Sequence, residues 1–160
     1  MASKDFTKSP YITKDGYQAL HSEVKALWEK RRKVVRHLAD AAAEGDRSEN
    51  AEYIYRKKQL REIDRRIYFI QKRLPILKII DEKPKSRSQI YFGAWVTLFS
   101  KEKGTNIYRI VGADEFNAKK KWISIDSPLA KALLQRKIGE KIKIKLPDGS
   151  ISYEIKEIKY

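Results

Sequence analysis

A short acidic segment holds the side chains of this chain that are best suited to metal chemistry. Residues 40–52 contain five carboxylates and one base, Arg47, although both flanks are strongly basic. Magnesium is usually held by one or two protein carboxylates, with water or phosphate oxygens completing its octahedron. Asp46 and Glu49 could therefore supply part of a magnesium site, and the remaining ligands would come from a partner. The five acids are Asp40, Glu44, Asp46, Glu49 and Glu52.

The same acids also have a purely structural interpretation. Asp46 and Glu49 have the spacing of a capping box, in which each side chain accepts a hydrogen bond from the backbone near the other. Negative charge at that point also suits the dipole of a following helix. This interpretation leaves Asp40, Glu44 and Glu52 unexplained. The charge pattern alone does not choose between the two interpretations.

Two apolar series on either side of the acids predict a pair of long helices. Both step by three and then four residues, which is the seam expected of paired helices, and each is interrupted by one arginine. Gly45 is suited to closing the first helix, and Pro75 is expected to kink or end the second. At ~1.5 Å rise per residue, some twenty-five residues make a rod of roughly 40 Å. The series are Tyr17, Leu20, Val24, Leu27, Arg31, Val34, Leu38 and Ala41, then Tyr53, Arg56, Leu60, Ile63, Ile67, Ile70, Leu74 and Leu77.

The second half of the chain has a different pattern. Residues 81–88 are polar, contain Pro84 and keep neither period, which predicts a linker. Runs rich in aromatic and β-branched residues follow and predict strands over 90–99, 106–111, 122–125, 141–146 and 151–158. Pro147-Asp148-Gly149 is typical of a hairpin turn, and Ser127-Pro128 predicts the start of a short helix over 129–136.

The predicted class is therefore α+β with two domains. Residues 1–80 form an antiparallel coiled-coil hairpin with an acidic end, residues 81–88 form the linker, and residues 89–160 form a small domain with a mostly antiparallel sheet and a short helix.

Composition narrows the partners. The chain has 36 Lys and Arg against 21 Asp and Glu, a net charge of +15, which favours a polyanion such as nucleic acid. It has no cysteine, so disulfides, thiolate nucleophiles and Cys-based zinc sites are excluded, and its two histidines are far apart. No apolar run is long enough to span a bilayer and no hydrophobic leader is evident, so we expect a soluble protein that is not exported and not membrane-bound.

Bases are concentrated beside the acidic segment. Residues 25–36 contain six bases and one acid, and residues 56–73 contain eight bases and two acids. For any single residue, a solvated helix face explains the charge. Collectively, the excess predicts a strip that guides RNA by its phosphates toward the acidic end. The predicted RNA contacts are the bases nearest that end on the second helix: Arg56, Lys57, Lys58 and Arg61.

Longer stretches resemble a known family. Residues 45–53 (GDRSENAEY) and 57–66 (KKQLREIDRR) closely resemble the bacterial Gre transcript-cleavage factors of the GreB type. The resemblance continues in residues 92–96 (FGAWV), 109–112 (RIVG) and 123–130 (ISIDSPLA), so it covers nearly the whole chain in the family's order.

The resemblance implies a transcription elongation factor that is not itself an enzyme. Its coiled coil would enter the secondary channel of a backtracked RNA polymerase, and an FKBP-like domain without isomerase activity would dock at the channel rim. Asp46 and Glu49 would help to hold the weakly bound second Mg²⁺ of the polymerase and position the attacking water. Glu44, Asn50 and Tyr53 would support them, and Asp126 and Pro128 would contact the rim.

The same resemblance implies that the partners are RNA polymerase and the 3′ end of the nascent RNA. It implies a monomer in the bacterial cytoplasm, with no stably bound cofactor of its own. Two alternatives remain open from the residues: a channel-plugging inhibitor of similar shape, and a general RNA-binding module whose acidic end is only a capped turn.

Overall fold

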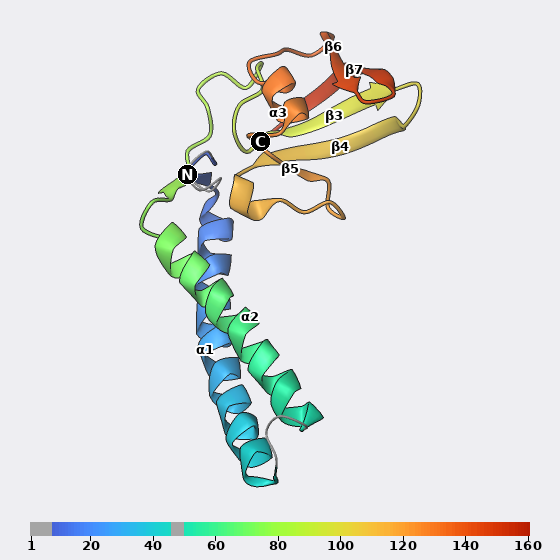
Figure 1. Cartoon of the computed structure of the whole chain (residues 1–160). Helices are drawn as coiled ribbons and strands as arrows, with labels where there is room; N and C mark the ends of the chain where they lie inside the picture. The colour runs from blue at the N-terminus through green and yellow to red at the C-terminus, as the bar shows by residue number, and fades with distance from the viewer. Residues whose placement is uncertain (1–7, 46–49) are drawn as a thin grey trace, which may run out of the picture. The chain divides into compact units, whose positions relative to one another are not determined.

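The computed structural model describes residues 8–45 and 50–160, which fall into two compact units (Figure 1). The hairpin unit comprises residues 17–77, and the sheet unit comprises residues 8–16 together with residues 78–160. The predicted α+β class is confirmed: a long helical hairpin comes first in the chain and a curved, mostly antiparallel sheet follows. Among the described residues, no helix has an apolar stretch long enough to cross a membrane.

The hairpin unit consists of two antiparallel helices. Helix α1 spans Lys14–Ala43 and helix α2 spans Ala51–Arg73 (Figure 1). Val34 on α1 packs with Ile63 and Ile67 on α2, and three half-buried residues of the same seams surround them, namely Val24, Leu27 and Leu60. The predicted seams are thus confirmed as the contact between the helices.

The ends of the helices follow their local sequence. Thr13 precedes α1, and its hydroxyl accepts a hydrogen bond from the backbone N–H of Gly16 at 3.1 Å, as an N-cap residue does. Gly45 follows α1 with φ of +145°, a conformation that glycine adopts without steric cost. Helix α2 ends at Arg73, with Leu74 as C-cap and Pro75 next, so the predicted stop at this proline is confirmed.

The sheet unit is built on five strands in the order β5-β4-β3-β7-β6. Neighbouring strands are antiparallel except β4 and β5, which are parallel. Their bounds are β3 Trp95–Ser100, β4 Gly104–Val111, β5 Trp122–Ser124, β6 Lys141–Leu146 and β7 Gly149–Lys159. The turn between β6 and β7 is at Pro147 and Asp148, where the sequence predicts it.

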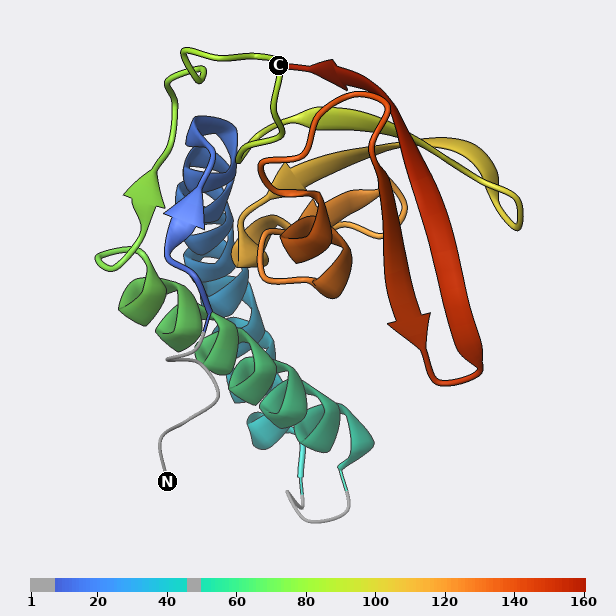
Figure 2. The same cartoon turned by 90° about the horizontal axis from the view of Figure 1, so that it is seen from above.

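One face of the sheet carries the core of this unit. Alternate residues of β3 and β7 are buried there, including Val96, Leu98, Ile151 and Ile155. Helix α3, Pro128–Leu133, lies in the concavity of the curved sheet (Figure 2) and adds Ala130 and Leu133 to the core. The hydroxyl of Ser127 accepts from the backbone N–H of Ala130 at 3.2 Å, so the predicted N-cap is confirmed.

Several boundaries differ from the sequence expectation. The short helix expected over 129–136 spans only Pro128–Leu133, and the strand expected over 106–111 begins at Gly104. The strand expected to start at Ile90 begins at Trp95, because Gly93 (φ +87°) takes the preceding residues through a turn. The chain also divides differently from the expected boundary at residue 80. Strand β1, Tyr11–Ile12, pairs in parallel with β2, Lys78–Ile79, and residues 8–16 belong with the sheet unit.

Carboxylates hold the N-terminal segment in the sheet unit. Glu115, at the end of the short 3-10 helix Ala113–Glu115, accepts hydrogen bonds from the backbone N–H of Thr13 (3.1 Å) and of Gly112 (2.8 Å), and from the Thr13 hydroxyl. Asp126 accepts from the backbone N–H of Ser9 at 2.8 Å and from the Ser9 hydroxyl. A sequence boundary based on periodicity misses the contacts of Ser9 and Thr13 because they join residues more than a hundred positions apart.

Candidate functional site at the end of the hairpin

The predicted acidic pair, Asp46 and Glu49, lies outside the described residues. The residues on either side of it are described and lie at the end of the hairpin unit, where α1 finishes and α2 begins. In the sequence, the acidic pair is thus flanked by the end of α1 and the start of α2.

Asn50 joins those two helix ends. Its side-chain oxygen accepts a hydrogen bond from the backbone N–H of Tyr53 at 3.1 Å, and its side-chain nitrogen donates to the backbone carbonyl of Ala41 at 2.8 Å. The N-cap of α2 is thus Asn50, and the expectation that Asp46 caps this helix is wrong. The acids of the segment are consequently not needed to begin α2, which weakens their purely structural interpretation.

The described acids of the segment differ in whether their carboxylates contact other residues. Glu52 accepts a hydrogen bond from Nε of Arg56 at 2.8 Å, one turn further along α2. Asp40 and Glu44 are exposed, and neither forms a hydrogen bond or ion pair through its carboxylate with another described residue. Within the described ranges, no three metal-binding side chains are grouped together. Glu44, predicted to support the acidic pair, therefore has its carboxylate available to a ligand.

The four predicted RNA contacts also divide into two kinds. Arg56 is half-buried and engaged, since it also donates to the Gln59 side chain at 3.1 Å. Lys57 is exposed, with its ammonium 5.9 Å from the ring centre of Tyr53. Lys58 and Arg61 are exposed and make no hydrogen bond or ion pair with other residues in the described part of the chain. The three exposed bases remain available to phosphates, whereas Arg56 contributes mainly to the helix.

Two ion pairs between the helices explain part of the charge excess. Arg31, the interruption of the first seam, donates from Nε to Asp64 of α2 at 2.6 Å. That hydrogen bond and the charge of Asp64 raise the pKa of Arg31 above its usual value. Arg66 of α2 binds both oxygens of Glu23 at 2.8 and 2.9 Å. These arginines hold the hairpin together, a role that the seam pattern did not indicate.

The two predicted docking residues lie side by side in the sheet unit. Pro128 is exposed in the first turn of α3, whereas Asp126 is half-buried and holds Ser9 as described above. The expected helix start at this point is confirmed, and the expected contact of both residues with a partner stays a prediction.

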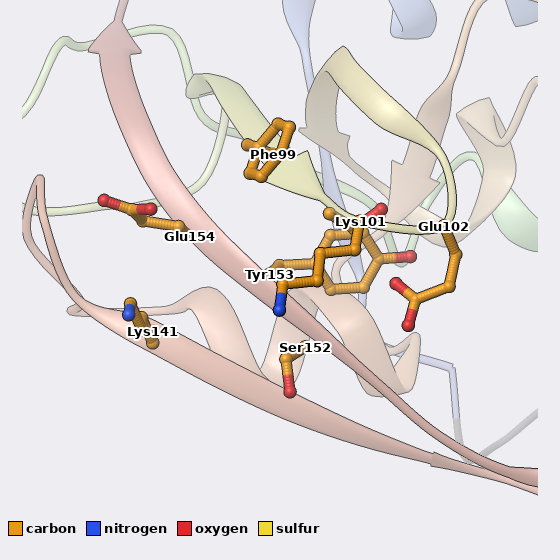
Figure 3. A pocket seen from close by; sticks show the side chains of 8 residues that line it. Phe99, Lys101, Glu102, Lys141, Ser152, Tyr153 and Glu154 are labelled. Carbon is orange, nitrogen blue, oxygen red and sulfur yellow. The ribbon is translucent and has the colours of Figure 1, made fainter.

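A separate hollow lies at one end of the sheet (Figure 3). Its volume is about 280 Å³, and its labelled lining combines Phe99 and Tyr153 with two bases and two acids, Lys101, Lys141, Glu102 and Glu154. Burial raises the pKa of Tyr153 above its usual value. The described residues that line this hollow include no histidine. Its lining thus mixes aromatic side chains with charges of both signs.

Comparisons with known proteins agree across the whole chain. Residues 10–79 match the family described as "Transcription elongation factor, N-terminal", and residues 84–160 match "Transcription elongation factor, GreA/GreB, C-term". The chain is 51% identical over 154 residues to transcription elongation factor GreB of Yersinia pestis, covering 96% of this chain and 90% of the relative. It is 52% identical over 154 residues to the GreB of Haemophilus influenzae, covering 96% and 98%.

Among solved structures, the chain aligns with GreA factor homolog 1 (Gfh1) of Thermus thermophilus. The TM-score is 0.44 and the identity 22%, over 96% of this chain and 100% of that one. The two family matches span both units, and the curated relatives align over nearly their full length at about half identity. This chain therefore belongs to the GreA/GreB family of transcription elongation factors.

Proposed function

We propose that this protein rescues arrested transcription by entering the secondary channel of RNA polymerase and stimulating the polymerase's own cleavage of backtracked RNA. The observation that carries the proposal is the arrangement of the hairpin unit. The two paired helices come together where Asn50 links the start of α2 to Ala41 of α1, and residues 40–52 of the sequence contain five acids and one base. Helix α1 has 30 residues, which at ~1.5 Å per residue gives roughly 45 Å.

The acidic segment acts through a metal ion held mainly by the polymerase. In two-metal phosphodiester chemistry, one ion activates water and the other stabilises the leaving oxygen. Asp46 and Glu49 donate carboxylate oxygens to the weakly held second Mg²⁺ and orient the attacking water. Exposed Glu44 adds negative charge beside them, and Asn50 and Tyr53 fix the start of α2 from which the segment extends. The protein itself then needs no metal site of its own.

The exposed bases of α2 bring the RNA to that ion. Lys57, Lys58 and Arg61 are solvent-exposed on the first turns after Asn50, so they meet the phosphates of an extruded 3′ end and direct it toward the turn. The sheet unit docks at the channel rim through Pro128 and Asp126. Because Asp126 already binds Ser9, docking either keeps that pair intact or replaces it. The protein acts as a monomer in the bacterial cytoplasm, with polymerase and nascent RNA as partners.

The test is a purified polymerase stalled with backtracked RNA labelled at its 3′ end. Adding the protein with Mg²⁺ should release short 3′-terminal fragments and restart elongation. If synthesis is blocked and no fragments form, the protein is a channel plug. If it binds free RNA equally well with and without polymerase and no cleavage follows, it is a general RNA-binding module.

A further inference from the structure

Aromatic and cationic side chains form a row across the sheet unit. Trp95 of β3 is the direct partner of Arg109 on β4, and Arg109 is in turn the partner of Trp122 on β5. Directly paired residues project from the same face of a sheet. The guanidinium carbon of Arg109 lies 4.9 Å from the ring centre of Trp95 and 5.2 Å from that of Trp122. The two indoles meet edge to face, with centres 6.3 Å apart.

The row lies on the face opposite the core. Val96 and Ile110, the neighbours of Trp95 and Arg109 along their strands, are fully buried on the other side. Large apolar side chains are exposed nearby: Ile107 at 54% and Phe116 at 62% of their surface. Isolated exposed apolar residues are common, but several beside a cationic row indicate a surface that binds a partner.

The Nε–H group of Arg109 finds no acceptor among the described residues. This Nε is buried, and the guanidinium forms no ion pair with any acid in the described part of the chain. Asp15, Asp81 and Glu82 line the same cavity of about 240 Å³ as Arg109, but none is within ion-pair distance of it. A guanidinium offers five N–H donors in a planar fork that matches phosphate. Stacking against two indoles holds that fork in place before any ligand binds.

Three consecutive lysines extend the positive charge beside Trp122. Lys119 and Lys120 are exposed, and the ammonium of Lys120 lies 4.7 Å from the ring centre of Trp122. Lys121 hydrogen-bonds the side chain of Asn106. No acid occurs between residues 116 and 125, so positive charge is concentrated in this stretch of the chain beside Trp122.

We propose that this face, formed by Trp95, Arg109, Trp122 and the lysines at 119 and 120, is a second nucleic-acid-binding surface that takes single-stranded RNA or DNA. A single strand supplies phosphates for the bases and flat rings that stack on aromatic side chains, in alternation along its length. An acidic peptide would satisfy the bases but offers no rings to stack on the aromatics. The surface lies in the sheet unit, apart from the bases of α2, and extends the protein's grip on nucleic acid beyond the site proposed above.

Intrinsic fluorescence tests the proposal directly, because the chain has only three tryptophans. Trp28→Phe in the full chain leaves Trp95 and Trp122 as the emitters. Titration with single-stranded oligonucleotides of about 12 nucleotides, uridine RNA in one arm and thymidine DNA in the other, should quench that emission. Quenching by either supports the surface, and the comparison shows which sugar it prefers. The assay contains no polymerase, so its failure would leave the proposed cleavage function untouched.

A pair of matched variants separates this surface from general charge. Lys119→Gln with Lys120→Gln should weaken binding about tenfold and reduce the slope of log affinity against log salt by about two. Lys143→Gln with Lys145→Gln removes the same charge from β6, at the opposite edge of the sheet, and should change affinity less than twofold. Lys121 is left unchanged because its φ is +57° and its ammonium is bonded.

Three results would overturn the proposal. The first is an absence of quenching by both oligonucleotides while thermal melts show the Trp28→Phe chain folded. The second is equal weakening by the two lysine pairs, which would mean that only net charge matters. The third is quenching by an oligoglutamate peptide as strong as that by RNA, which would identify the surface as a protein-docking site.

Discussion

The side-chain amide of Asn50 donates a hydrogen bond to the backbone carbonyl of Ala41 at 2.8 Å, across the end of the hairpin. The same side chain caps α2 through the backbone N–H of Tyr53. One residue thus links the start of α2 to the buried Ala41 near the end of α1.

Asn50→Ala should lower the stability of the hairpin unit by about 2 kcal/mol, because it removes an N-cap and a hydrogen bond between the helices, each typically worth about 1 kcal/mol. Asn50→Asp is the matched control, since a carboxylate still accepts from Tyr53 but cannot donate to Ala41. Urea unfolding followed by circular dichroism at 222 nm gives both values. If Asn50→Asp were as stable as the unsubstituted chain, the bond to Ala41 would contribute nothing, and if the two variants were equally stable, the cap to Tyr53 would contribute nothing.

Gly16 and Gly112 should respond oppositely to alanine once the Glu115 side chain is removed: one substitution should raise the stability of the chain and the other should lower it. A Cβ on Gly16 would collide with the Glu115 carboxylate, whereas a Cβ on Gly112 would collide with the backbone carbonyl of Tyr11. In a Glu115→Ala background, Gly16→Ala should therefore stabilise the chain by about 0.5–1 kcal/mol, as alanine does in helices. Gly112→Ala should still destabilise it, by about 1–3 kcal/mol.

Thermal or urea unfolding tests both predictions by comparing the Glu115→Ala chain with its two double variants, with the unsubstituted chain as the reference. If Gly16→Ala remains destabilising without the Glu115 side chain, the contact between them is not what requires glycine at position 16.

The hydroxyl of Tyr160 forms two hydrogen bonds with the backbone of residues 89 and 91. The Tyr160 hydroxyl donates to the carbonyl of Gln89 at 2.6 Å and accepts from the backbone N–H of Tyr91 at 2.8 Å. Tyr160→Phe should destabilise the sheet unit by about 1–3 kcal/mol, because both partners lose their bond. Tyr55→Phe, at an exposed position on α2, should have little effect on the same melting curve.

Burial also makes the sheet unit sensitive to alkaline pH. It raises the pKa of Tyr108, Tyr153 and Tyr160 above the usual 10.0, so the folded state favours the neutral phenol. The resulting stabilisation is fully present below pH 10 and is lost as the pH rises through the higher folded values. The free energy of unfolding, measured from urea curves between about pH 9 and 11.5, should therefore decrease as the pH rises. The decrease should be smaller for Tyr160→Phe. A flat profile would contradict the prediction.

Asp46→Asn combined with Glu49→Gln should abolish stimulated cleavage while leaving polymerase affinity nearly unchanged. The exchange removes the oxygens proposed to bind Mg²⁺, but neither residue caps α2, since Asn50 does. Fragment release from a backtracked complex and competition for polymerase binding measure the two properties separately. Asp40→Asn with Glu52→Gln, which removes two acids from the same segment, serves as the control. Cleavage that survives the first pair would refute the metal role.

Charge reversal on α2 should weaken the delivery of RNA without preventing entry. Lys57→Glu with Lys58→Glu places acids where exposed bases now lie, so cleavage should decline several-fold and become less dependent on salt. Arg56→Gln should affect helix stability more than cleavage, because Arg56 is engaged with Glu52 and Gln59. A larger loss of cleavage from Arg56→Gln than from the lysine pair would reverse this assignment.

Local patterns predicted those parts of the fold that depend on nearby residues. The apolar steps identified Val34, Ile63 and Ile67 as the contact between the helices, and the stop before Pro75 and the cap at Ser127 were also predicted correctly. Each depends on side chains a few positions apart, so periodicity and capping preferences are sufficient. Spacing left the cap of α2 open, because Asp46 and Asn50 are both good capping residues, whereas the structure has Asn50 as the N-cap and bonds it to Ala41 as well.

Composition, periodicity and motifs were enough to predict the two helices, the class of the second unit, the acidic segment and the family. Tertiary structure decided which charges are available and where the chain divides: Arg31 and Arg66 are engaged across the hairpin, Asp126 and Glu115 hold residues 9 and 13, and Arg109 lies between two indoles. These contacts join residues far apart in the chain, and strand pairing and helix register bring them together. Such partners cannot be identified from local spacing, because many bases could reach many acids until the fold selects one pairing.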